Sequence, residues 1–203
     1  MASPDSEPRC EDLRRRALED PFVRFVRDAM AELGCDTREG SEGAGRRGFR
    51  VACAPCGDET QIGHFCSGEE RAGAGGAPAR GVVLCSDNVE RFRLSADHVK
   101  RAVLHELIHA YDECRAVVEP TNCEHVACTE VRAALLSGDC DWANEVQRRN
   151  LGFKGQGAAC ARRRAELSVA SHAACAEPDA AKRAVAAVFE RCYADTAPFL
   201  GKF

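Results

Sequence analysis

The sequence predicts an α+β fold that is mostly helical, with a small β region, in one domain over residues 1–203. Three observations predict it: apolar residues recur at helical spacing in several stretches, two short runs have strand character, and 13 cysteines favour a disulfide-stapled periphery. Aromatic residues make up only 6% of the chain, so the core depends on Ala, Val and Leu. We therefore expect a compact domain in which helices dominate.

The first predicted helix begins at Pro21. Asp20 is a suitable N-cap, and proline suits the first helical position because its ring presets φ. Apolar side chains then recur at helical spacing until Gly34 ends the pattern. We expect residues 1–10 to form a flexible tail.

A small β region follows the first helix. Alternating apolar residues at 49–53 and a compact apolar run at 81–85 predict a small sheet or hairpin pair, stapled by cysteine. Residues 38–48 are rich in Gly, Arg and Glu without an apolar period, and 71–81 are similar. We expect mobile loops at both places.

The second half is predicted to be helical. Ser95 can cap a helix that continues through Asp112 or slightly beyond. Thr121 and Glu124 form a capping-box pattern, so a further helix is expected to open there and to end at Gly138. Two more helical stretches are expected near 160–172 and 179–192.

The charge balance argues against nucleic acid as a partner. Lys and Arg total 28 against 32 for Asp and Glu, a net charge of −4, so no overall positive field would attract a phosphate backbone. No run approaches the roughly 18 apolar residues that span a bilayer. We therefore expect any membrane association to be peripheral.

The 13 cysteines are abnormal for a protein of a reducing compartment. We expect a disulfide framework formed in an oxidising space, with at least one thiol outside it because the count is odd. The first residues lack the apolar segment of a secretory signal. The mitochondrial intermembrane space would satisfy both observations.

Cys53 and Cys56 form a CxxC pair that allows three interpretations. It could be a redox pair, half of a structural zinc site completed by Cys66 and Cys85, or two members of separate disulfides. No second CxxC exists and no βαβ pattern surrounds this one. We favour disulfides.

The run HELIHAYD, residues 105–112, carries the strongest functional signal. His105 and His109 are four residues apart, so on a helix their side chains project about 40° from one another and can share one metal ion. Glu106 lies to the side, where its carboxylate can take a proton from water activated by Zn²⁺. This HExxH pattern predicts a zinc-dependent endopeptidase with a zincin-like active-site helix.

A catalytic zinc ion needs a third protein ligand. We favour Glu130, which lies 21 residues after His109 in the next predicted helix. His125 and Asp112 are rivals. His125 is about 140° from Glu130 on a helix, so the two are not expected to ligate together, and Asp112 could instead orient a ligand.

The remaining histidines and one basic run favour structural interpretations. His64, His98 and His172 are expected to be surface or packing residues. The three arginines at 162–164 most often mean only a solvated helix face.

Four segments carry a resemblance to a known family: HELIHAYDECR, CEHVACTEVRAALLSGDC, CARRRAELSV and CYADTAPF. In order and over most of the chain, from about Cys10 to Phe199, they resemble the mitochondrial inner-membrane-associated metalloprotease that matures and helps to assemble an ATP synthase subunit. The resemblance implies a cysteine-rich peripheral protein of the inner membrane that faces the intermembrane space.

The resemblance also implies a substrate. Members remove the presequence of a mitochondrially encoded membrane subunit of the ATP synthase Fo sector and assist Fo assembly. On this reading His105 and His109 bind Zn²⁺ and Glu106 is catalytic. Two other hypotheses stay open at this point: a non-proteolytic assembly chaperone for Fo, and a purely structural zinc and cysteine protein.

Overall fold

The computed structural model describes residues 6–35, 49–57, 60–67, 80–150 and 155–199. The chain divides into two compact units, Met1–Arg115 and Ala116–Phe203, which we call the first and second units and describe separately. The single domain expected over 1–203 stays a prediction.

The first unit combines helices with a small mixed sheet. Its elements are α1 (Ser6–Leu18), α2 (Pro21–Glu32), β1 (Arg50–Ala54), β2 (Gly63–Cys66), β3 (Gly81–Cys85), α3 (Ser86–Arg91) and α4 (Ala96–Arg115). The strand order is β1-β3-β2, with β1 parallel and β2 antiparallel to β3. The predicted small sheet is confirmed. The two predicted strands do not form a hairpin, since they pair in parallel.

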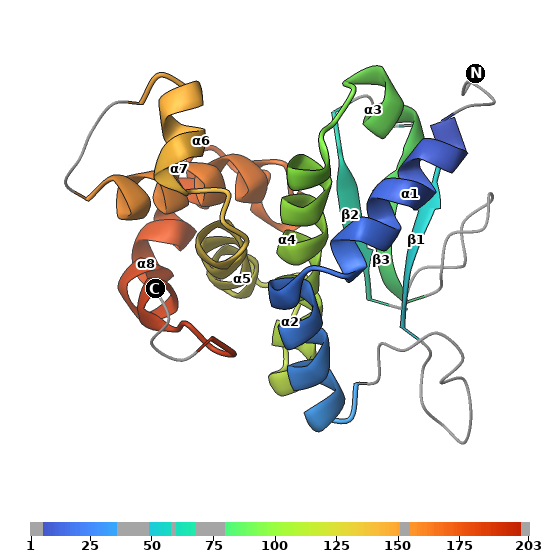
Figure 1. Ribbon diagram of the computed structural model, residues 1–203. Helices are drawn as coiled ribbons and strands as arrows, with labels where there is room; N and C mark the ends of the chain where they lie inside the picture. Colours follow the sequence, from blue (N-terminus) through green and yellow to red (C-terminus); the bar gives the residue numbers. More distant parts are fainter. Residues whose placement is uncertain (1–5, 36–48, 58–59, 68–79, 151–154, 200–203) are drawn as a thin grey trace. The chain divides into compact units, whose positions relative to one another are not determined.

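Helix α1 corrects the expected flexible tail. Residues 6–10 belong to this helix, and Cys10 is fully buried in a disulfide with Cys53 of β1. Residues 1–5 lie outside the described residues. Helices α1 and α4 pack against the sheet and against one another (Figure 1).

The helix boundaries of the first unit follow the predicted capping chemistry. The Asp20 carboxylate accepts a hydrogen bond from the Phe22 backbone N–H at 2.9 Å, which confirms it as the N-cap of α2. The Ser95 hydroxyl oxygen accepts one from the His98 N–H at 3.3 Å at the start of α4. Gly34, with φ of +86°, follows the end of α2.

Gly81 occupies a position that only glycine suits. Its φ is +147°, and a Cβ atom there would lie 1.9 Å from the backbone oxygen of Arg50 on the paired strand. A mobile loop was expected over 71–81. Gly81 instead belongs to β3. Residues 71–79 of that predicted loop, and all of 38–48, lie outside the described residues.

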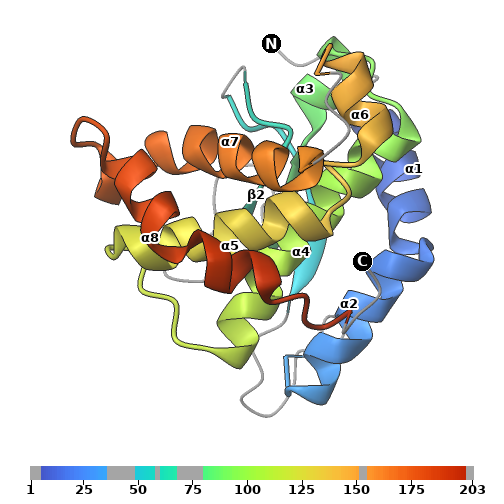
Figure 2. The same ribbon diagram turned by 90° about the vertical axis from the view of Figure 1, so that its left-hand side faces the viewer.

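The second unit is helical in its described part. Its elements are α5 (Cys123–Leu136), α6 (Trp142–Gln147), α7 (Gln156–Ala170), the 3₁₀ helix η1 (Ala173–Cys175) and α8 (Ala180–Ala194). Helices α5, α7 and α8 pack against one another around a core made largely of Ala, Val and Cys (Figure 2). The expected helices near 160–172 and 179–192 are α7 and α8.

The start of α5 differs from the predicted capping box. Asn122 is the N-cap, and its side-chain oxygen accepts hydrogen bonds from the backbone N–H groups of Glu124 at 3.0 Å and His125 at 3.4 Å. Thr121 lies one residue too early for this role. The predicted end is confirmed, because Ser137 is the C-cap and Gly138 follows with φ of +78°.

Disulfides form the expected framework. Three lie in the first unit and three in the second: Cys10–Cys53, Cys35–Cys114, Cys56–Cys85, Cys123–Cys175, Cys128–Cys192 and Cys140–Cys160. Cys66 is buried and is not part of a disulfide. This confirms the expectation that at least one thiol lies outside the framework. The CxxC cysteines belong to two different disulfides, as favoured.

Two of the three arginines at 162–164 make ion pairs with carboxylates of limited or no exposure, which corrects the solvated-face interpretation. Arg163 donates to Glu145 at 2.7 Å, and this carboxylate has no exposed surface. Arg164 donates to Asp139 at 2.6 Å. Arg148 of the same cluster donates to both carboxylates. The basic run thus joins α7 to the chain around α6.

The electrostatics of this cluster lower two acid pKa values. Burial alone would raise the pKa of Glu145, but hydrogen bonds from Arg163, Arg148 and Gln156 outweigh it and hold the pKa below its usual value. Burial likewise opposes ionisation of Asp139, and its arginine partners again lower the pKa overall. Both acids are therefore ionised at neutral pH.

The second unit should lose stability in acid because of this cluster. A depressed folded-state pKa contributes stability that is complete above the unfolded values of about 3.9 and 4.3 and is lost as the pH falls through the folded pKa values. Glu145→Gln should flatten this acid limb, whereas Glu190→Gln, whose side chain is 92% exposed, should leave it unchanged. Urea unfolding of both variants between pH 7 and 3 measures this, and parallel curves would contradict it.

Arg132 of α5 should be a major stabilising residue of the second unit. Its side chain is 1% exposed and donates to the backbone oxygens of Asp195 and Ala197, and it pairs with the Asp195 carboxylate at 2.8 Å. Arg132→Met should destabilise the unit by about 3–5 kcal/mol, since these acceptors lose their donor. Arg191→Met, at an exposed site on α8, should change stability by about 0.5 kcal/mol or less. Denaturant unfolding followed by hydrogen exchange in α5 and α8 tests the difference.

Candidate metal centre

Helix α4 brings the two histidines of the HExxH run together. The ring centroids of His105 and His109 are 4.8 Å apart, with the ring planes at 74°. Both side chains and that of Glu106 are half-buried, so they lie at the boundary between the core and solvent. One helical turn thus presents two imidazoles and a neighbouring carboxylate along one edge of the helix.

The rest of α4 holds this edge in place. Its apolar face is buried and packs against α1, α2, β2 and β3. The buried residues of this face are Val99, Val103, Leu104, Leu107, Ile108, Ala110 and Tyr111. A disulfide from Cys35 ties the last turn at Cys114 to the end of α2. The helix therefore cannot rotate about its axis without exposing this face.

The donor set at this edge fits a divalent metal such as Zn²⁺. Neutral imidazole nitrogens are preferred zinc ligands, and adjacent rings one turn apart can reach a single ion. Glu106, one residue after His105, is left to act on water and not to ligate. The assignment of these three residues to a metal centre stays a prediction from the pattern that the geometry fits.

Asp112, a rival third ligand, is engaged by another residue of α4. Asp112 is 4% exposed, and its carboxylate accepts a hydrogen bond from Arg115 Nε at 3.0 Å. Arg115 also lies over the ring of Tyr111, at 5.5 Å from the centroid. This pairing was not predicted from the sequence, although an acid and a base three residues apart on a helix are its usual signal.

His125, the second rival, uses the nitrogen Nδ1 for a local hydrogen bond. The backbone N–H of Glu119 donates to this atom at 3.2 Å. In the neutral ring the proton then lies on Nε2, which leaves no lone pair there for a metal. Glu130 is half-buried on α5 of the second unit, and its place as third ligand stays a prediction.

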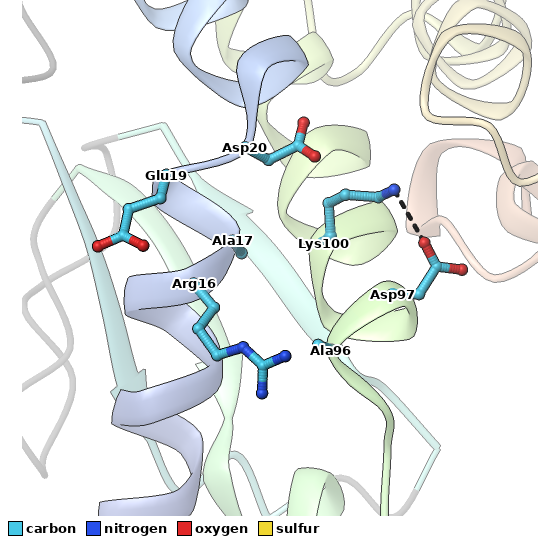
Figure 3. Close-up of a pocket in the computed structure, with 7 residues that line it drawn as sticks. All are labelled: Arg16, Ala17, Glu19, Asp20, Ala96, Asp97 and Lys100. Atoms are coloured by element: carbon cyan, nitrogen blue, oxygen red, sulfur yellow. Dashed lines mark ion pairs between the residues drawn. The ribbon is translucent and has the colours of Figure 1, made fainter.

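A separate hollow of about 360 Å³ lies elsewhere in the first unit, between the end of α1, the turn that follows it and the start of α4 (Figure 3). It is lined by Arg16, Ala17, Glu19, Asp20, Ala96, Asp97 and Lys100. Asp97 pairs with Lys100 at 2.8 Å, and the hydrogen bond from Lys100 lowers the pKa of Asp97. Because its acids and bases are mixed and it contains none of the HExxH residues, this hollow is not the candidate site.

A helix that presents HExxH at the edge of a packed core is typical of metallopeptidases. The chain belongs to the Peptidase M76 family, whose profile matches residues 8–200. The resemblance found in the sequence is thereby confirmed.

Curated relatives carry the same family character. The chain is 36% identical to the mitochondrial inner membrane protease ATP23 homolog of Homo sapiens, over 96% of this chain and 70% of that protein. It is 33% identical to the mitochondrial inner membrane protease ATP23 of Malassezia globosa, over 97% of this chain and 81% of that protein. It is 35% identical to the mitochondrial inner membrane protease ATP23 of Mycosarcoma maydis, over 88% of this chain and 83% of that protein. These relatives are proteases, which supports a peptidase.

No solved structure matches the chain, so the zincin-like fold stays a prediction beyond the helices and mixed sheet described above. Within the described residues, no helix has both the length and the apolar character needed to cross a membrane.

Metal content should depend on the two adjacent histidines. His105→Ala and His109→Ala should each lose the bound metal, because two imidazoles from one turn are needed to hold it. Glu130→Gln should lower the occupancy, whereas Asp112→Asn and His125→Ala should keep it. His98→Ala, in the first turn of the same helix, serves as control. Metal analysis of the purified oxidised proteins measures this, and full occupancy in Glu130→Gln would remove Glu130 as the third ligand.

Proposed function

We propose that the protein is a zinc metalloendopeptidase whose active site is the HExxH turn of α4. The observation that carries this proposal is the pair of adjacent rings of His105 and His109, held at the edge of a buried helix with Glu106 beside them. Membership of the Peptidase M76 family supports the reaction class. The nature of the two nitrogen donors supports zinc.

Each residue of this site has a distinct proposed role. His105 and His109 hold the Zn²⁺ ion, and Glu130 is proposed to complete the protein ligands. Bound zinc supplies Lewis acidity that lowers the pKa of water to about 7 and polarises the scissile carbonyl. The Glu106 carboxylate accepts the proton of the attacking water and delivers it to the leaving amine. Its half-buried position lets it reach both substrate and solvent.

The proposed substrate is the precursor of a membrane subunit of the ATP synthase Fo sector. On this proposal the protein removes the presequence of that mitochondrially encoded subunit and assists Fo assembly. The basis is the family resemblance, together with relatives that are proteases of the mitochondrial inner membrane.

The proposed location is the intermembrane-space side of the inner membrane, with peripheral attachment. The disulfide framework supports an oxidising compartment, because disulfides would be reduced to thiols in a reducing one. The absence of a spanning helix among the described residues agrees with peripheral association.

Replacing Glu106 should separate catalysis from metal binding. Glu106→Gln should keep the metal and lower peptide hydrolysis by about 10²–10⁴-fold, the usual contribution of a general base. Glu113→Gln is a matched control, since it lies on the same helix and is also half-buried. Presequence removal in organello and hydrolysis of a presequence peptide are the measurements.

The same pair of variants distinguishes the alternative function. Normal Fo assembly with Glu106→Gln, while the presequence is retained, would favour the non-proteolytic chaperone as the essential role. Unchanged hydrolysis in Glu106→Gln would contradict the peptidase mechanism itself.

A further inference from the structure

A second group of metal-binding side chains lies at one end of the small sheet in the first unit. Sulfur atoms of Cys56 and Cys85 and a ring nitrogen of His64 all lie within 4.8 Å of one another. The two cysteines form a disulfide, and His64 Nδ1 faces Cys56 Sγ at 3.9 Å. His64 was expected to be a surface or packing residue, with no link to either cysteine.

Strand register explains why these three residues meet. His64 of β2 pairs with Val83 of β3, and Cys85 lies two residues further along β3, so His64 and Cys85 share one face of the sheet. Ala54, the last residue of β1, pairs with Cys85, and Cys56 follows two residues beyond the strand.

This face of the sheet is not the one that holds the helix α1. Cys53 of β1 pairs in register with Leu84 and points to the opposite face, where its disulfide reaches Cys10 of α1. Since side chains alternate along a strand, Cys85 and His64 point the other way. The group therefore lies on the face of the sheet opposite to the Cys10–Cys53 disulfide.

The thiol of Cys66 is too far along the sheet to join the group. Cys66 pairs with Gly81, four residues before Cys85, which corresponds to roughly 13 Å along the strand. Any metal here would thus have three protein ligands, Cys56, His64 and Cys85, and an open fourth position.

The distance between the histidine and the nearer sulfur suits a zinc ion. Tetrahedral Zn²⁺ with bonds of about 2.3 Å to sulfur and about 2.0 Å to nitrogen sets these two atoms roughly 3.5 Å apart. The observed separation is 3.9 Å. The two sulfur atoms would have to move apart once their bond is broken.

The backbone around Cys56 is held independently of the disulfide. The two carboxylate oxygens of Asp87 on α3 accept hydrogen bonds from the backbone N–H groups of Cys56 at 3.4 Å and Gly57 at 3.3 Å. Cys85 is fully buried at the end of the central strand. The ligands would therefore stay near one another after reduction.

We infer that Cys56, His64 and Cys85 form a redox-gated metal site: a disulfide in the oxidised protein, and a Zn²⁺ site when that disulfide is reduced. A dithiol reductant supplies two electrons and two protons, leaves as its own disulfide, and converts the Cys56–Cys85 bond into two thiols. Zn²⁺ then displaces the two thiol protons and binds two thiolates and the unprotonated Nδ1 of His64.

The consequence concerns the state of the chain before oxidation. Soft thiolate ligands favour zinc over hard cations, so the reduced chain would take up zinc at this site. A disulfide oxidant would take two electrons from the two thiolates, leave as its own dithiol, release the ion and close the Cys56–Cys85 disulfide. Metal and disulfide are thus mutually exclusive here, in contrast with the HExxH turn, whose donors are not oxidised.

Cobalt titration tests the inference because thiolate ligands give Co²⁺ a sulfur-to-metal charge-transfer absorption that imidazole and carboxylate ligands do not. The full chain is reduced with a phosphine under native conditions and titrated with Co²⁺ and then Zn²⁺, beside the oxidised protein. We expect the absorption only after reduction, with one additional metal ion per chain.

Variants assign the absorption to this group. His64→Ala keeps both cysteines and should weaken binding of the additional ion at least tenfold, and Cys56→Ser should abolish its charge-transfer band. Cys140→Ser, in the second unit, is the matched cysteine control and should leave the ion bound. Zinc should also slow re-formation of the Cys56–Cys85 disulfide, measured by alkylation and mass spectrometry, in the control but not in His64→Ala.

Three results would overturn the inference. They are no additional ion after reduction, equal binding by His64→Ala and the control, and loss of folded structure in the reduced chain even with zinc present. None of them bears on the HExxH turn, whose metal is measured in the oxidised protein.

Discussion

Burial of the apolar face of α4 is the constraint on which the candidate site depends. Val103, Leu107 and Ile108 are fully buried, which fixes the rotation of the helix and leaves the edge with His105, Glu106 and His109 half-exposed. The packing against α1, α2 and the sheet, and the disulfide at Cys114, hold that rotation. A metal site needs ligands that are held in place before the ion binds, and the packing of the core fixes the helix that carries them.

Disulfides compensate for cores that are built from small side chains. The core of the second unit contains mostly Ala, Val and Cys, which bury little apolar area per residue. Each native disulfide contributes about 2–4 kcal/mol by limiting the unfolded chain, and each unit contains three. The stability of this protein is thus tied to the redox state of its surroundings, and the inferred Cys56–His64–Cys85 site would add a second ligand-dependent state.

Arginine side chains satisfy buried acceptors in the second unit. Arg132 is buried with backbone oxygens as partners, and Arg163 reaches a glutamate without exposed surface. Both belong to the second unit, where few large apolar residues are available to fill the core. The planar guanidinium satisfies several acceptors at once, so one residue can join two or three segments. A basic run on a partly exposed helix face can therefore also supply the partners of buried carboxylates.

The sequence by itself determined the helix that carries the HExxH turn, its Ser95 cap, the disulfide chemistry and the family, because these depend on local spacing and residue type. It did not determine which cysteines pair, since pairing depends on strand register and helix packing across 20 to 79 residues. It also missed α1, where Cys10 is buried by tertiary contacts that have no local signal. The meeting of His64 with Cys56 and Cys85 was decided by the sheet alone, because only parallel and antiparallel pairing around β3 brings three separate segments to one end.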